Sequence, residues 1–136
     1  MATISESITD EVNIFINRIN PNPRMSFKEI ILNQDYWEGK YWDSWANQIG
    51  IYVFINDTEY LYVGRALKNM SFGRRIESHT DKNRFSVANE WGAIIRSPET
   101  RILLYTFEDR NEDYWISALE LLLFDKFDPK YNVRRG

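Results

Sequence analysis

Glu120 is the one charged residue in an otherwise apolar stretch, Ile116–Phe124, that the sequence predicts to be helical. On a helix its neighbours three and four positions away include Ile116, Leu123 and Phe124. An ionised carboxylate among apolar side chains is costly unless a base or a cation lies beside it. Glu120 is therefore a candidate metal ligand or ion-pair partner. The alternative is that it lies at the side of the helix and points to water.

Arg75 and His79 are four residues apart in a basic stretch that the sequence predicts to be helical, so both side chains lie on one face. His79 is the only histidine in the chain. Its side chain is the one whose ordinary pKa lies near neutrality, which makes it a candidate for acid–base chemistry. The alternative is a surface histidine on a basic helix.

Tyr52 and Tyr62 belong to two adjacent predicted strands, Ile51–Ile55 and Tyr60–Val63, joined by the turn-forming residues Asn56–Thr58. The two tyrosines face the same side if they pair directly or are offset by an even number of positions. Direct pairing would require a loop with an odd number of residues. Two hydroxyl groups would then converge at one site, although half-buried tyrosines are also typical of strands.

The remaining pattern places these residues in a small α/β or α+β fold. Ser5–Ile19 has the apolar spacing of a helix, with Ser5 or Thr9 as its cap. The aromatic-rich segment Met25–Gln48 predicts helical pieces or ordered loop. We expect a three-stranded sheet covered by helices, built from the hairpin, helices Lys68–Ser78 and Ser86–Arg96, strand Arg101–Phe107 and helix Asp113–Phe127.

Composition restricts the class of protein. The chain has 136 residues, 43% of them hydrophobic, which predicts one globular domain. It contains no cysteine, which excludes disulfides and thiolate metal sites and fits a cytoplasmic protein. No apolar stretch is long enough to span a membrane, and the N-terminus lacks the pattern of a signal peptide.

The net charge of −3 argues against a broadly basic, nucleic-acid-binding surface. The charges are unevenly spread, because residues 1–49 hold an excess of acids whereas Arg65–Arg84 contains six bases against two acids. The sequence therefore predicts one local basic patch, which either contacts phosphates or is an ordinary solvated face.

Gly50-Ile51-Tyr52, followed after nine residues by Tyr62-Val63-Gly64, resembles the pair of motifs that names the GIY-YIG nuclease family. The resemblance continues in order through Gly64-Arg65-Ala66, the step from Arg75 to His79, Glu120 in a late apolar helix, and Pro129 followed by Asn132. It covers Gly50 to Val133 and is especially similar to the compact restriction-endonuclease branch. The four-residue step to His79 selects Arg75 over Arg74 as the family's arginine.

The resemblance implies an N-terminal helical and aromatic extension, residues 1–49, packed on a nuclease core, residues 50–136. It also implies hydrolysis of DNA phosphodiester bonds with one divalent cation, Mg²⁺ or Mn²⁺, held by Glu120. The catalytic residues that it implies are Tyr52, Tyr62, Arg75, His79, Glu120 and Asn132, and the phosphate-binding residues are Arg65, Lys68 and Arg74.

The sequence leaves two alternatives open. One is a module that binds DNA or protein and cleaves weakly or not at all. The other is a nuclease whose DNA specificity comes from a partner protein. A self-contained enzyme would need two active sites to break both strands, which predicts a homodimer. The aromatic cluster Tyr36–Trp45 would be the interface of that dimer or would pack within the chain.

Overall fold

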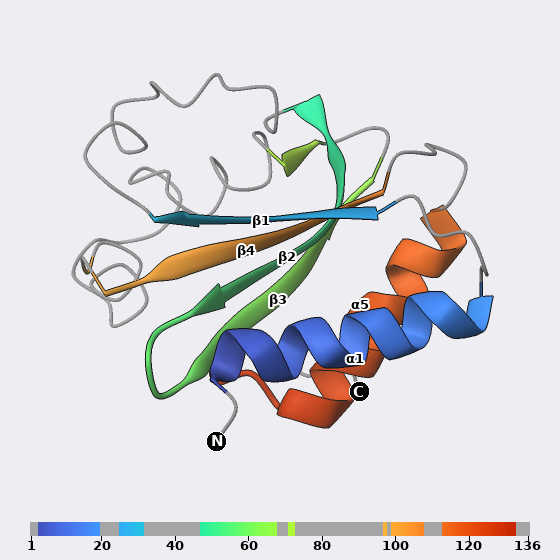
Figure 1. The fold of residues 1–136 in the computed structure, drawn as a ribbon. Helices are drawn as coiled ribbons and strands as arrows, with labels where there is room; N and C mark the ends of the chain where they lie inside the picture. Colours follow the sequence, from blue (N-terminus) through green and yellow to red (C-terminus); the bar gives the residue numbers. More distant parts are fainter. Residues whose placement is uncertain are drawn as a thin grey trace.

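A four-stranded antiparallel sheet forms the middle of the structure (Figure 1). The structure is a computed structural model that describes residues 3–19, 25–31, 47–67, 71–72, 97, 99–107 and 113–132. The strands are β1 (Met25–Ile31), β2 (Ile49–Ile55), β3 (Tyr60–Ala66) and β4 (Arg101–Phe107), in the order β1-β4-β2-β3. The strand β3, which carries the second motif, is therefore at one edge.

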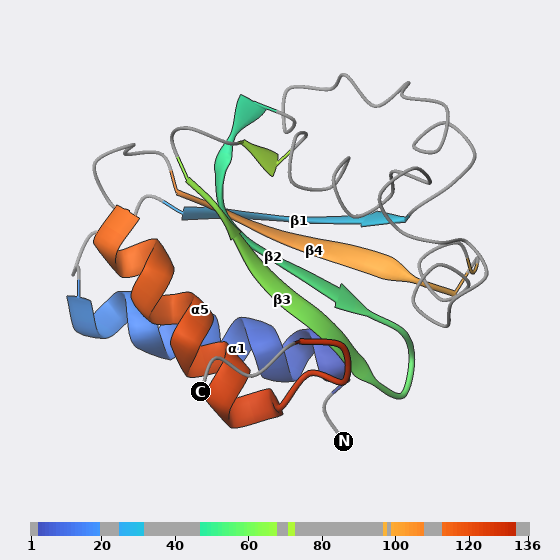
Figure 2. The ribbon, with the colours of Figure 1, turned by 180° about the vertical axis from the view of Figure 1, so that it is seen from behind.

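Two helices, α1 (Ile4–Ile19) and α5 (Asp113–Phe127), pack against one face of this sheet (Figures 1 and 2). Apolar residues four positions apart, Ile8, Val12 and Ile16, give α1 one buried side. Strands β2 and β4 supply most of the residues that the helices cover, which are Ile49, Ile51, Val53, Ile55, Leu103, Tyr105 and Phe107. One hydrophobic core thus holds both helices to the sheet.

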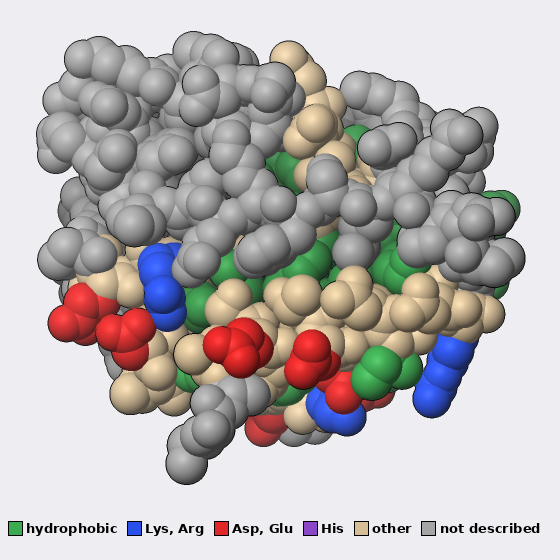
Figure 3. Space-filling model, in the orientation of Figure 1, with side chains coloured by type: hydrophobic (Ala, Val, Ile, Leu, Met, Phe, Trp, Pro, Cys, Tyr) green, Lys and Arg blue, Asp and Glu red, His purple; other side chains and the backbone are tan. Residues whose placement is uncertain are grey.

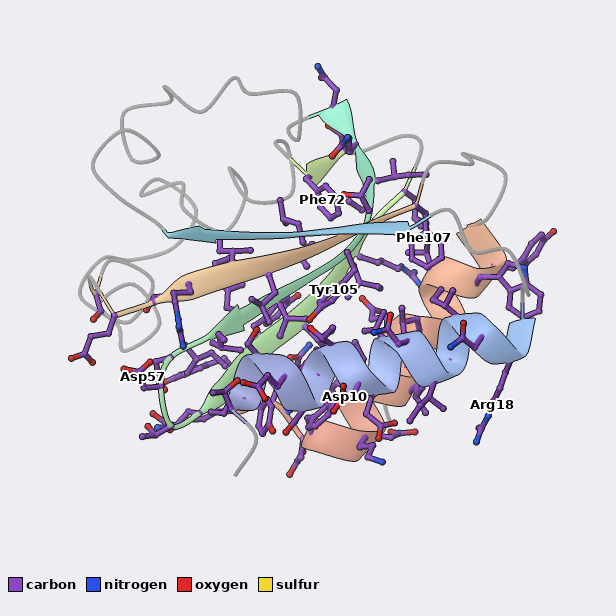
Figure 4. The ribbon with its side chains drawn as sticks, in the orientation of Figure 1. Asp10, Arg18, Asp57, Phe72, Tyr105 and Phe107 are labelled. Carbon is purple, nitrogen blue, oxygen red and sulfur yellow. The ribbon has the colours of Figure 1, made fainter. Side chains whose placement is uncertain are left out.

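Polar contacts fix the position of α1. The backbone N–H of Glu6 donates to Thr3 Oγ1 at 3.1 Å, so the helix cap is Thr3 and the predicted caps Ser5 and Thr9 are wrong. Thr9 instead lies 2.8 Å from the hydroxyl of Tyr105, which Figure 4 shows directed from β4 toward α1. Lys126 Nζ of α5 contacts a carboxylate oxygen of Glu11 at 2.7 Å.

The prediction of a small α+β fold is confirmed, and strand Arg101–Phe107 and helix Asp113–Phe127 have the predicted bounds. The prediction of helical pieces or loop over Met25–Gln48 is wrong for Met25–Ile31, which is β1, a fourth strand beyond the expected three. The strand pairs with β4 along its whole length. A distant partner of this kind leaves no trace in the local pattern of residues.

Several expectations are not tested by the described residues. The predicted helices of residues 68–78 and 86–96 fall almost wholly outside them. The boundary after residue 49 stays a prediction, and we note that α1 and β1 share the core and the sheet with the residues that follow. No helix in the described segments combines the length and apolarity needed to cross a bilayer.

The hairpin loop between β2 and β3 has four residues, Asn56–Glu59, because Ile55 pairs with Tyr60. Asn56 Oδ1 accepts hydrogen bonds from the backbone N–H groups of Thr58, at 2.9 Å, and Glu59, at 2.7 Å. This agrees with the turn chemistry predicted from the sequence. The Glu59 carboxylate accepts a hydrogen bond from Asn56 Nδ2 and lies 3.3 Å from Lys130 Nζ.

The Asn56 hydrogen bond, and then Lys130, hold the pKa of Glu59 below its ordinary value of 4.5. A carboxyl group whose pKa is lower in the folded state stabilises the fold above its unfolded pKa, and loses that effect as the pH falls through its folded pKa. We expect Glu59→Gln to lower the thermal midpoint at neutral pH and to have a vanishing effect in acid. Melting curves of the unaltered protein and of Glu59→Gln, recorded from neutral to acid pH, measure the difference in thermal midpoint. Glu99→Gln is the matched control, and an equal pH-dependent difference there would contradict the assignment.

Candidate active site

Tyr52 of β2 and Tyr62 of β3 lie on the sheet face opposite to the helices. Strand alternation places Tyr52 there because its neighbours Ile51 and Val53 belong to the helix-covered core. The two rings stack with centroids 6.1 Å apart and an interplanar angle of 20°. The structure therefore brings the two motif tyrosines together on one face.

The strand pairing that achieves this differs from direct pairing. Tyr52 lies opposite Gly64, two positions along β3 from Tyr62. The pairing shifts by one residue near the loop, where Leu61 is an extra residue in a β-bulge. Regular pairing after the four-residue loop would have turned Tyr62 to the helix-covered face, because successive side chains alternate. The bulge thus decides which face Tyr62 occupies.

The glycines of both motifs lie where no side chain fits. A Cβ atom at Gly64 would overlap the ring and the hydroxyl oxygen of Tyr52. Tyr52 therefore lies directly over the backbone of β3. Gly50 has a φ of 147°, and a Cβ atom there would overlap the carbonyl oxygen of Tyr105 in β4. These two close approaches give the glycines of the motifs a physical role.

Two phenylalanines enclose Tyr52. The edge-to-face contacts have centroid distances of 6.0 Å to Phe54 and 6.4 Å to Phe72, and Tyr52 is only 2% exposed. Figure 4 shows Phe72 on the side of the sheet away from α1. The sequence did not single out Phe72 as a site residue. Its one signal was a lone aromatic residue in a basic stretch.

Glu120 lies on the helix-covered side of β3 and is 8% exposed. Its Oε1 atom is 3.8 Å from Nη1 of Arg65. The expected partner of the buried carboxylate is thus an arginine, and Glu120 does not point to water. Arg65 was expected to bind a flanking phosphate, and in the structure it contacts the candidate metal ligand.

The two halves of the site meet at one edge strand. Gly64, under the Tyr52 ring, and Arg65, beside Glu120, are consecutive residues of β3. Because side chains alternate along a strand, the tyrosines and the carboxylate lie on opposite sides of β3. A phosphodiester at this edge would have hydroxyl groups on one side and a charged pair on the other.

Asn132 holds the backbone of β3 beside Tyr62. Its Oδ1 atom accepts a hydrogen bond from the N–H of Val63, and its Nδ2 atom donates to the carbonyl of Val63, both at 2.8 Å. The N–H groups of Lys130 and Tyr131 donate to the carbonyls of Tyr60, at 3.0 Å, and Leu61, at 2.9 Å. Successive carbonyls of a regular strand point to opposite edges, so this double contact depends on the bulge. Asn132 therefore fixes the backbone of β3 next to Tyr62.

Four predicted site residues, Lys68, Arg74, Arg75 and His79, lie outside the described residues. Their roles as phosphate contacts and in proton transfer stay predictions. The described residues contain no group of three or more His, Cys, Asp or Glu that could hold a metal ion. The Glu120 carboxylate is a hard oxygen donor that fits Mg²⁺ or Mn²⁺, and water and phosphate oxygens would have to complete the coordination.

Comparison with known proteins gives a relative from Thermosipho africanus, the UvrABC system protein C. The two chains are 33% identical over 84 residues, which is 62% of this chain and 13% of the relative. The chain therefore corresponds to a small part of the relative's length. No model of a protein family matches the chain, and no solved structure gives a significant match.

The overlap at Gly64 predicts a specific coupling with Tyr52. Gly64→Ala should lower the free energy of unfolding by about 1–3 kcal/mol, because the new methyl group displaces the Tyr52 ring. In a Tyr52→Ala background the same change should have little effect, since the space is then empty. Chemical denaturation of the four proteins measures the coupling. Equal effects of Gly64→Ala in both backgrounds would show that the position of the Tyr52 ring does not depend on the glycine at position 64.

Proposed function

We propose that this chain is an endonuclease domain of the GIY-YIG type that hydrolyses DNA phosphodiester bonds with Mg²⁺ or Mn²⁺. One observation carries the proposal: the buried carboxylate of Glu120 lies beside Arg65 on one side of β3, and the stacked tyrosines occupy the other side. The ordered motifs from Gly50 to Asn132 and the similarity to a UvrABC system protein C support a nuclease-type domain that acts on DNA.

The described residues divide the proposed chemistry among them. Glu120 would hold the cation, which when bound stabilises charge on the phosphoryl oxygens. Tyr52 would accept the proton of the attacking water, directly or by relay. Tyr62 would orient the phosphate or the water. Asn132 would keep Tyr62 in place through the backbone of Val63.

The remaining roles fall on the basic stretch after β3. Arg75 would bind the phosphate and stabilise the charge that develops on it. His79 would take the proton from Tyr52. Lys68 and Arg74 would contact phosphates on either side of the cleaved bond.

Charge indicates where DNA would approach. Figure 3 shows acidic side chains along α1, on the face of the molecule nearest the viewer. The helix carries Glu6, Asp10 and Glu11 against one base, Arg18, in its last turn. A phosphate backbone would be repelled there. We infer that DNA approaches the edge of the sheet at Gly64 and Arg65, away from α1.

Glu120→Gln tests the proposed activity, because it removes the charge and keeps the shape. Nicking of supercoiled plasmid in Mg²⁺ or Mn²⁺ should fall by at least about a hundredfold, and a chelator should abolish cleavage by the unaltered protein. Asp125→Asn, an exposed acid-to-amide change on the same helix, is the matched control and should cleave normally. Undiminished, chelator-sensitive cleavage by Glu120→Gln would refute the role of Glu120.

The class of DNA substrate is a separate measurement. Duplex, branched and single-stranded DNAs should be digested in parallel and the ends mapped. Binding of any of these DNAs without cleavage, in either metal, would favour the alternative of a DNA-binding subunit that cleaves only weakly or not at all.

Arg65 couples the carboxylate to the substrate in this proposal. Its side chain is 29% exposed and reaches Glu120 from the edge strand. A guanidinium group binds phosphate as well as carboxylate, so DNA would attract Arg65 away from Glu120. Loss of this positive neighbour would lower the repulsion that a cation meets at the carboxylate. Metal binding would then be stronger in the presence of DNA.

Arg65→Gln is expected to remove this coupling. The free protein should bind Mn²⁺ about fivefold more tightly, because a positive charge close to the carboxylate no longer opposes the cation. Titration calorimetry without DNA measures the affinity. Arg101→Gln, which removes the arginine paired with Asp57 at 2.9 Å, is the control and should leave the affinity unchanged. An unaltered or weaker affinity for Arg65→Gln would disprove the exchange.

A further inference from the structure

The outer side of α5 is apolar and exposed. Among the described residues, four of the five exposed large hydrophobic side chains belong to α5: Tyr114 (84% exposed), Trp115 (43%), Leu121 (54%) and Leu122 (36%). With Ala118 between them, these residues form the α5 stripe, on the helix nearest the viewer in Figure 2. Trp115 also contacts Phe15 of α1 edge to face, with ring centroids 6.5 Å apart.

Helical geometry separates the α5 stripe from the core. The buried residues Ile116, Leu119 and Leu123 point to the core, and the stripe lies on the outer side of the helix, with Trp115 at its border with α1. A helix that is apolar on all sides is typical of a helix covered on all sides. In this chain the sheet and α1 cover only part of it. The α5 stripe therefore has the character of an interface.

The α5 stripe carries no charge. Between Tyr114 and Leu122 the one charged residue is Glu120, which is buried against β3. The exposed Asp125 continues the same face of the helix, four positions after Leu121, and Lys126 is paired with Glu11. In a symmetric contact each residue meets the same patch on the partner, so charges of one sign would repel each other. The stripe itself adds no such repulsion, and two antiparallel helices that cross near Ala118 would hold their Asp125 side chains roughly 20 Å apart, beyond the screening length.

We propose that the α5 stripe binds a second copy of this chain, with the two α5 helices antiparallel and crossing at Ala118. In that arrangement a residue three or four positions after Ala118 meets one three or four positions before it. Leu121 then lies against the partner's Trp115, and Leu122 against the partner's Tyr114. The small side chain of Ala118 at the crossing lets the two helices approach closely. The stripe is thus complementary to itself.

The area agrees with a weak dimer. The exposed part of the stripe amounts to roughly 500 Å² for each copy, so the contact would bury about 1,000 Å² in total, close to the lower limit of specific interfaces. Glu120 and the stacked tyrosines lie away from the stripe. Dimerisation would leave both candidate sites accessible, and the inference does not depend on the proposed function.

Sedimentation velocity from low micromolar to submillimolar protein tests the dimer. The unaltered chain should shift from monomer to dimer as its concentration rises. Leu121→Glu should weaken dimerisation by on the order of a hundredfold, because it places a charge in the apolar contact. Thr58→Glu adds the same charge at the exposed hairpin loop and should dimerise normally. A chain that is monomeric at every concentration, or a Leu121→Glu variant that dimerises normally, would overturn the proposal.

Cross-linking tests the crossing point. The chain has no cysteine, so Ala118→Cys introduces a single thiol. Under a mild oxidant this variant should form a disulfide-linked dimer much faster than Thr58→Cys. Equal rates for the two variants would exclude the crossing at Ala118. Tyr114→Ser, at a largely exposed position that leaves the core intact, supplies a second test of the dimer and should weaken it.

Discussion

The ring of Tyr52 lies against the bare backbone of Gly64, and the arrangement of the candidate site depends on that contact. The ring fits because β2 and β3 pair in one register, with Tyr52 opposite Gly64. The same register needs the bulge at Leu61 to bring Tyr62 to the same face. The bulge in turn is held by hydrogen bonds from the segment that ends at Asn132. The close contact between the Tyr52 ring and the backbone of Gly64 thus depends on the strand register, on the bulge and on the hydrogen bonds from the segment that ends at Asn132.

Helix α5 connects the two ends of that chain of contacts. It directs Glu120 toward β3, and at its C-terminal end Asp128 and Pro129 lead into the segment that binds the edge of β3. The helix therefore places the carboxylate and the positioning amide of Asn132 against the same strand. Its outer side, the α5 stripe, takes no part in these contacts with β3. A partner bound to the stripe need not disturb the site. The two sides of α5 can therefore serve separate purposes.

The distribution of charge restricts the proposed DNA contact to a small part of the surface. The chain has a net charge of −3, and α1 presents acids where a broad DNA-binding surface would need bases. The buried charge of Glu120 beside Arg65 is a local feature, and burial protects such a pair from screening by salt. A protein of this charge can act on DNA only through a focused contact, which agrees with a site at one strand edge.

Much of this protein follows from its sequence alone. Residue spacing predicted helices α1 and α5 and the three expected strands, because burial of one face imposes a period on each element. The order of Gly50, Tyr52, Tyr62, Gly64 and Glu120 predicted the candidate site, and the lone carboxylate in an apolar helix predicted either a charged partner or a position that faces water.

Tertiary structure decided the rest, and in each case through a contact between distant residues. Only pairing with β4 makes Met25–Ile31 a strand. Only the bulge decides that Tyr62 faces Tyr52, since a shift of one residue reverses every side chain. Only packing of α5 on β3 selects Arg65 as the partner of Glu120. The local pattern of residues shows how polar and apolar side chains alternate within a segment. It does not show with which distant segment that segment will pair or pack.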